Sequence, residues 1–136
     1  MDFDRAVKIA VSGLAAQSGR MRVVAENIAN AESTARSAGG DPYRRKVPTF
    51  SSHFDKALGA NTLELGKVEL DRTDFHQRYE PGHPAADANG YVKYPNVDTL
   101  VETVDMREAQ RSYEANLNVV TATRRMIIQT LGILKA

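Results

Sequence analysis

Apolar side chains recur along the first part of the chain at alternating steps of four and three residues. The stripe has one polar member, Gln17, and consists of Phe3, Val7, Ala10, Leu14, Gln17, Met21, Val24, Ile28 and Ala31. This spacing places the side chains on one face of an α-helix, whereas a strand would require strict alternation. The pattern predicts a helix over about residues 3–31 that packs along its length against other helices. Because Gly13 and Gly19 each cost about 1 kcal/mol relative to Ala in a helix, we expect packing to hold it.

The last part of the chain repeats the same spacing. Its stripe consists of Met106, Gln110, Tyr113, Leu117, Val120, Arg124, Ile127, Leu131 and Leu134. Asp98 or Thr99 is placed to cap this helix, and Pro95 upstream prevents an earlier start. The sequence therefore predicts a second long helix that begins near residue 99.

Polar residues interrupt both stripes. Gln17, Gln110 and Arg124 stand where a helix seam prefers aliphatic groups. Polar pairing that sets register in a larger assembly and simple solvent exposure both account for them. Asparagine, a poor helix former, occurs twice in each helix, at Asn27, Asn30, Asn116 and Asn118. We expect some of these amides to form hydrogen bonds across helix contacts.

The middle of the chain is not a long helix. Residues 37–42, Ser-Ala-Gly-Gly-Asp-Pro, break the first pattern, and most of the prolines follow before the second helix. Alternation predicts one strand over residues 43–49 and a second over residues 68–70, with a bulge at Gly66 to reconcile the parity of the leucines before it. Residues 51–60 are open to a helical turn, and Asn89-Gly90 predicts a turn before a short strand.

These elements predict a mainly α protein with a small β insert. Its long N- and C-terminal helices pack as a coiled-coil-like pair, with the β-containing module between them. We expect residues 1–36 and 99–136 to form one α-helical domain together. Residues 37–98 form a linker and a small β-rich outer module.

Composition narrows the class of protein further. The chain has 136 residues, a formal charge of +1 and no cysteine. The length allows one compact domain, and the absence of cysteine excludes disulfides, thiolate nucleophiles and Cys-ligated metals. No apolar run is long enough for a membrane-spanning helix, so no direct membrane insertion is expected. Acidic residues near the N-terminus and a helical pattern across the supposed cleavage site argue against a cleaved signal peptide.

Candidate chemistry is sparse. His83, with Glu80 and Asp87 nearby in sequence, is the best candidate for a metal site of a small metal-dependent enzyme, but a tight polar loop accounts for these residues more simply. Basic residues 44–46 are flanked by aromatic residues, yet three charges in a neutral module indicate a solvated strand face or pairing with a neighbouring copy rather than nucleic-acid binding. We therefore expect no catalytic residues, no cofactor, no metal and no nucleic-acid partner.

Two sets of residues resemble the bacterial flagellar axial proteins, the rod and hook family. Residues 12–17, Ser-Gly-Leu-Ala-Ala-Gln, with residues 24–34, Val-Ala-Glu-Asn-Ile-Ala-Asn-Ala-Glu-Ser-Thr, are similar to the motif that ends the first helix of these proteins. Residues 79–98, 109–117 and 126–131 are more selective and resemble members found in the proximal rod. Residues 51–78 carry little of the likeness.

The resemblance implies a structural subunit of the flagellar basal-body rod without enzymatic activity. Such a subunit polymerises with copies of itself and other rod proteins into the drive shaft, after export by the flagellar type III apparatus without a cleaved signal peptide. The implied assembly interface, which also draws on the heptads, contains Leu14, Met21, Asn27, Ile28, Asn30, Tyr113, Asn116, Leu117, Val120, Ile127 and Leu131. A free-standing coiled-coil adaptor remains the alternative, and it would form a closed oligomer of fixed mass.

Overall fold

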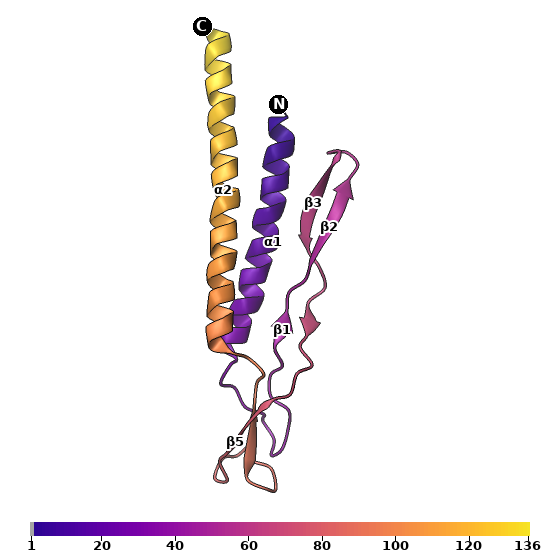
Figure 1. Ribbon diagram of the computed structural model, residues 1–136, viewed down its shortest axis with the longest axis vertical. Helices are drawn as coiled ribbons and strands as arrows, with labels where there is room; N and C mark the ends of the chain where they lie inside the picture. The colour runs from indigo at the N-terminus through magenta and orange to yellow at the C-terminus, as the bar shows by residue number, and fades with distance from the viewer. Residues whose placement is uncertain (1) are drawn as a thin grey trace. The chain divides into compact units, whose positions relative to one another are not determined.

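A computed structural model describes residues 2–136 (Figure 1). Helix α1 covers Phe3–Ala29 and helix α2 covers Thr99–Lys135. Six strands lie between them in the sequence: β1 Lys46–Val47, β2 Phe50–Asp55, β3 Ala60–Leu65, β4 Glu69–Leu70, β5 His76–Tyr79 and β6 Tyr91–Tyr94. The predicted fold class, two long packed helices with a small β module between them, is confirmed. No helix within residues 2–136 is long and apolar enough to cross a membrane.

The chain divides into two compact units, and both helices contribute to each. The first unit contains residues up to 21 together with residues 49–67 and 107–136. The second unit contains residues 22–48 and 68–106. The predicted division, with the helical ends apart from residues 37–98, stays a prediction.

In the first unit, α1 and α2 run antiparallel and lie very close together. A Cβ atom built on Gly13 of α1 would lie 2.7 Å from Asn116 Nδ2 of α2, so the glycine is what permits this approach. The Arg20 guanidinium pairs with the Glu108 carboxylate further along, at 3.5 Å. Small residues such as Ala16 and Ala109 are fully buried, which keeps the two backbones close.

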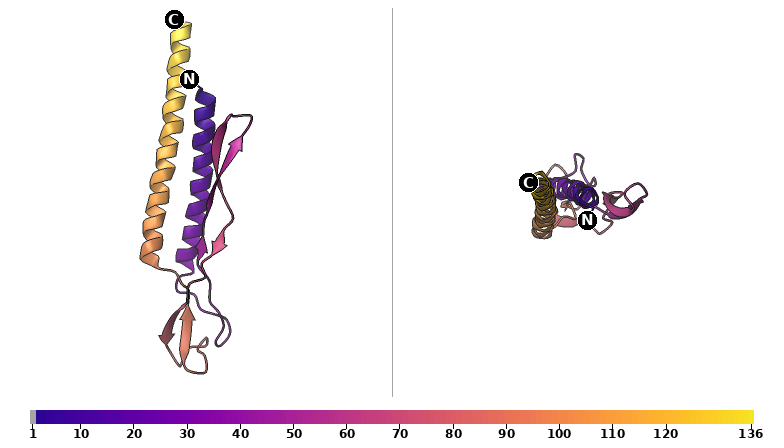
Figure 2. Two further views of the ribbon diagram at one scale, coloured as in Figure 1. Left: turned by 45° about the vertical axis from the view of Figure 1, so that its right-hand side comes forward. Right: turned by 90° about the horizontal axis from the view of Figure 1, so that it is seen from above.

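The β2–β3 ribbon lies beside α1 in the same unit (Figure 2). Leu65 of β3 packs against Gly19, and the Leu63 amide donates a hydrogen bond to Ser12 Oγ at 3.2 Å. Residues 51–60, for which a helical turn was an open possibility, are therefore strand and turn. The turn closes at Gly59, whose φ of 63° lies in the left-handed region that favours glycine.

The second unit contains the other two antiparallel ribbons. β1 pairs with β4 through Lys46–Leu70 and Val47–Glu69, so the two strands predicted there exist but are shorter than expected. The expected bulge at Gly66 is wrong: that residue joins two separate ribbons, and its amide donates to the Thr49 carbonyl.

The small core of the second unit lies at the β5–β6 ribbon. Val92 and Tyr94 of β6 pack with Ala85 from the preceding loop. The turn predicted at Asn89-Gly90 is present, with Gly90 at a φ of 84° and its amide bonded to the Asp87 carbonyl. This core is small, so polar contacts must contribute much of what holds the unit together.

The predicted stripe of α1 is confirmed, because all nine of its side chains are buried or half-buried. Only every second residue of the predicted α2 stripe faces inward. Met106, Tyr113, Val120 and Ile127 face inward, but the remaining inward positions are Glu102, Ala109, Asn116 and Thr123. Gln110, Leu117, Arg124, Leu131 and Leu134 are exposed.

Candidate functional site

The second unit is organised around the buried side chain of Asn27, near the end of α1. Its Oδ1 accepts hydrogen bonds from the Tyr43 hydroxyl at 2.7 Å and the Lys46 amide at 3.0 Å. Its Nδ2 donates to the Lys46 carbonyl at 2.8 Å and to Glu102 Oε2 at 3.2 Å. All four hydrogen-bonding positions of the amide are used, so Asn27 links α1, β1 and α2 at one point. The expectation that an Asn bonds across helices is confirmed here.

Glu102 and Arg45 form the charged part of this cluster. The Glu102 side chain is 1% exposed and accepts a hydrogen bond from Arg45 Nε. Arg45 also pairs with Asp71 at 3.4 Å and Asp105 at 3.8 Å. Burial opposes the charge of Arg45, but the hydrogen bond and charge of Glu102, followed by those of Asp71, leave its pKa above the ordinary value.

The Tyr43 hydroxyl lies at the edge of this cluster, where its neutral form is favoured. Burial, with the nearby carboxylates of Glu26 and Glu102, raises the pKa of the Tyr43 hydroxyl to about 12. The hydroxyl therefore remains a hydrogen-bond donor to Asn27 across the physiological pH range. Lys46, whose main chain Asn27 holds, pairs with Glu26 through its ammonium group.

Asn96 completes the cluster from the segment before α2. Its Oδ1 accepts the Arg45 amide at 2.8 Å, and its Nδ2 donates to the carbonyls of Asp71 and Thr73. The Asp71 carboxylate accepts the Thr73 amide at 2.9 Å, which, with Arg45, lowers its pKa. We call Asn27, Tyr43, Arg45, Lys46, Asp71, Asn96 and Glu102 the polar junction; it fixes where the chain leaves α1 and enters α2.

A second candidate surface lies on α2 in the first unit. Large apolar side chains are exposed along its outer side and its last turns: Leu117, Val119, Met126, Ile128, Leu131, Ile133 and Leu134. The end of α2 also continues past the first turn of α1 (Figure 1). A monomer gains nothing by exposing so many large apolar groups, and a surface of this kind marks an interaction site.

The predicted assembly residues separate into two groups. Those half-buried or buried within the chain are Leu14, Met21, Asn27, Ile28, Asn30, Tyr113, Asn116, Val120 and Ile127. Leu117 and Leu131 are 45% and 52% exposed. The Asn30 side-chain amide donates a hydrogen bond to the Glu26 carbonyl one turn earlier in α1. The structure thus brings Asn27 into the polar junction and leaves Leu117 and Leu131 on the open surface.

The other candidate residues serve local structure. His83 Nδ1 accepts the Ala85 amide, the Glu80 carboxylate accepts the Tyr94 hydroxyl, and Asp87 accepts the Asn89 and Tyr91 amides. No group of three or more possible ligands within residues 2–136 is arranged for a metal.

Two of the three basic residues at 44–46 pair with carboxylates of their own chain. Arg45 and Lys46 pair with Glu102 and Glu26. The Arg44 guanidinium lies 4.2 Å from the centre of the Phe75 ring and donates to two carbonyls. The acidic partners of Arg45 and Lys46 therefore lie in the same unit, which differs from the expected solvated face, and pairing of this run with a neighbouring copy stays a prediction.

Comparison with known proteins decides what these surfaces belong to. Residues 8–36 match the family model described as flagella basal body rod protein, and residues 88–133 match that of the flagellar basal body rod FlgEFG protein C-terminal region. The flagellar basal-body rod protein FlgC of Agrobacterium fabrum is 54% identical over 131 residues, which cover 96% of this chain and 94% of the relative. The chain belongs to the FlgC family of flagellar basal-body rod proteins. The FlgC proteins of Salmonella typhimurium and Bacillus subtilis are 42% and 38% identical and cover 90% and 93% of this chain. The resemblance read from the motifs is therefore confirmed, and the chain is a structural rod subunit of the flagellar basal body.

Membership of this family gives the two surfaces their context. The matched regions contain residues 8–29 of α1, with Asn27, and residues 99–133 of α2, with Glu102 and most of its exposed apolar residues. Sequence reasoning missed Glu102 and Arg45 as partners, and Glu102 lies in the first turn of α2. The available signal was a carboxylate at heptad spacing before Met106, which indicates a polar residue facing inward.

Proposed function

We propose that this rod subunit polymerises with copies of itself and other rod proteins through the exposed apolar side of α2, in the proximal part of the rod. The exposure of Leu117 and Leu131 is the observation that carries the proposal. Their burial between subunits would stabilise the assembly by about 25 cal/mol for each Å² of apolar surface removed from water. Contacts between unlike surfaces that do not close a ring generate an open helical structure, which is able to transmit torque.

We also propose that the predicted interface residues act in two ways. Leu117 and Leu131 touch neighbouring subunits. Leu14, Met21, Ile28, Tyr113, Asn116, Val120 and Ile127 hold α1 and α2 together, so that the exposed apolar residues of α2 are presented to those neighbours. Asn27 acts through the polar junction, and Asn30 closes the end of α1. The proposed role includes export by the flagellar type III apparatus without a cleaved signal peptide.

The test is Leu117→Asp, with Asn118→Asp as the matched control on the adjacent exposed position. Leu117 is 45% exposed, so we expect the substitution to leave the helix pair intact while it places a carboxylate in the proposed subunit contact. We expect a loss of swimming and at least a tenfold fall of the chain in purified basal bodies, at an unchanged total cellular level. The control should assemble normally. Normal swimming of Leu117→Asp would contradict the proposal.

We infer that the role is structural throughout, without catalysis. The side chains that suggested an enzyme, His83, Glu80 and Asp87, already accept hydrogen bonds that shape the β5–β6 turn. His83→Ala should therefore leave rod assembly and swimming unchanged. Assembly of a rod that fails to support swimming in this variant would instead indicate a chemical role for the loop.

A further inference from the structure

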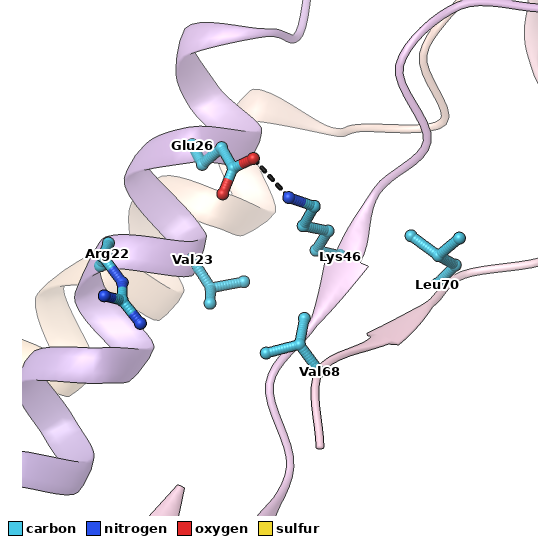
Figure 3. Close-up of a pocket in the computed structure, with 6 residues that line it drawn as sticks. All are labelled: Arg22, Val23, Glu26, Lys46, Val68 and Leu70. Carbon is cyan, nitrogen blue, oxygen red and sulfur yellow. Dashed lines mark hydrogen bonds and ion pairs between the residues drawn. The ribbon is translucent and has the colours of Figure 1, made fainter. Parts of the chain in front are cut away.

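An open cavity of about 290 Å³ lies in the second unit, between α1 and the β1–β4 ribbon (Figure 3). Its walls come from Val23 on α1 and from Val68 and Leu70 at β4. The side chains of Val23 and Val68 point toward one another across it. The ion pair between Glu26 and Lys46 closes one side. Three apolar and three charged residues line the cavity, so it is suited to an apolar side chain that lies next to a polar group.

Two groups of this cavity are without partners in their own chain. Leu70 is 56% exposed although it lines the same cavity as the buried Val23. Arg22 is exposed at the edge of the cavity, and its guanidinium makes no hydrogen bond or ion pair with any residue of the described part of the chain. The Lys46 ammonium, by contrast, is neutralised by Glu26. The cavity therefore presents an apolar wall and one uncompensated positive charge.

The end of α2 has the complementary properties. In the first unit Gly13 faces Asn116 and Arg20 faces Glu108, so at this antiparallel register Phe3 lies level with about residue 126. Beyond that level α2 has no α1 beside it, and Ile128, Leu131, Ile133 and Leu134 are each more than half exposed. The last turn of α2 has free carbonyl groups with a negative partial charge beside its own Lys135, and the Arg22 guanidinium is able to donate hydrogen bonds to these carbonyl groups.

We propose that the cavity takes the exposed apolar end of α2 from a second copy of this chain, with Arg22 facing the last carbonyls of that helix. The proposal rests on the polymerisation proposed above and names one of its contacts. Because the donor and acceptor surfaces differ, each copy offers both an empty cavity and a free helix end. Such a head-to-tail contact propagates along an open assembly rather than closing a dimer.

The natural absence of cysteine makes this contact directly testable. Two differently tagged copies are expressed together in a strain lacking its own copy, one with Leu70→Cys and the other with Leu131→Cys or Leu134→Cys. Each chain carries one cysteine, so a disulfide that joins both tags must form between copies. Glu69→Cys is the matched control, since adjacent residues of β4 point to opposite faces. Basal bodies are purified from swimming cells and oxidised mildly.

We expect a dimer with both tags for Leu70→Cys with at least one of the two helix positions, at least tenfold more abundant than with Glu69→Cys. Rods that contain both copies and rotate, but give no such dimer, would overturn this contact while leaving polymerisation intact. A link from Leu70→Cys to a polypeptide of another mass would also overturn it, because the occupant would then be a different rod protein. Absence of wild-type chain from the rod would instead refute the polymerisation itself.

A second measurement covers the case in which the cysteine variants do not assemble. Arg22→Gln removes the charge at the rim without removing any contact within the chain, and Arg36→Gln makes the same change at an exposed site of the same unit away from the cavity. Each variant competes with tagged wild type for incorporation. We expect Arg22→Gln to be under-represented in basal bodies at least threefold and Arg36→Gln to be incorporated equally. Equal incorporation of both variants would overturn the proposal.

Discussion

Glu102→Gln tests whether the polar junction is held by charge. The change keeps the size of the side chain and an oxygen that accepts from Asn27, but it removes the negative charge next to Arg45. Breaking a buried ion pair by neutralising one partner costs about 3–5 kcal/mol. The Arg45 side chain is 20% exposed and retains Asp71, so we expect a cost at or just below the lower limit of that range, about 2–3 kcal/mol.

Amide hydrogen exchange of purified basal bodies measures this cost locally. The Lys46 amide donates to Asn27 Oδ1 and the Arg45 amide donates to Asn96 Oδ1, so both exchange only when the junction opens. Each 1.4 kcal/mol is a factor of about ten in an opening equilibrium, and about 2–3 kcal/mol corresponds to exchange that is faster by about 30- to 100-fold. We expect this acceleration at both amides in Glu102→Gln.

Glu108→Gln is the matched control, because it makes the same change in the same helix. Glu108 also pairs with an arginine, Arg20, but its side chain is 64% exposed. Exposed ion pairs contribute about 0–1 kcal/mol, so exchange at the two junction amides should change less than about threefold. Exchange in Glu102→Gln that also stays within threefold of wild type would refute the view that this ion pair holds the junction.

Three further predictions concern other parts of the chain. Gly13→Ala should lower incorporation into basal bodies, because the added Cβ would lie 2.7 Å from the Asn116 side chain. At Gly132 an added Cβ meets nothing within 4 Å, so Gly132→Ala should raise helix stability by up to about 1 kcal/mol, as judged by helical circular dichroism. Because the pKa of Tyr43 is raised to about 12, its contribution to stability is fully present below pH 10 and is lost as pH rises through 12. After discounting for partial exposure, this contribution amounts to about 1–2 kcal/mol. Hydrogen exchange of basal bodies at pH 9 and at pH 12, compared with that of Tyr43→Phe, measures it. In the dilute monomer, residues 5–30 should exchange their amides without strong protection, since we expect the helices to become ordered on assembly; strong protection there would contradict this expectation.

The sequence predicted α1 well because its inward positions are apolar or small. No second apolar stripe of comparable length runs along this helix to compete with them. It predicted the existence of α2 equally well, but not which of its faces packs on α1. Glu102 and Asn116 face inward while Leu117 and Leu131 face out. Apolar periodicity identifies a face that avoids water, but it does not say whether the neighbour lies in the same chain or in another.

The ribbons were harder to predict because their partners are set by contacts distant in sequence. The β2–β3 turn contains no Asn-Gly or Asp-Gly pair, and its closing Gly59 gives only a weak local signal. The polar junction was invisible for a similar reason. Asn27, Arg45 and Glu102 are far apart in the chain, and only the antiparallel placement of α1 and α2 brings them together.

This distribution of polar and apolar groups has a physical consequence for assembly. The contact between α1 and α2 contains glycine, alanine, asparagine and threonine at Gly13, Ala109, Asn116 and Thr123, which remove little apolar surface from water. Met106, Tyr113, Val120 and Ile127 add half-buried apolar groups, but most of the large apolar side chains in the second half of α2 remain exposed. A helix pair of this kind gains little stability alone, so the greater part of the hydrophobic stabilisation becomes available only when neighbours cover α2. The polar junction then has a separate role: hydrogen bonds with fixed partners set the geometry of the chain, and the apolar surface supplies the association energy.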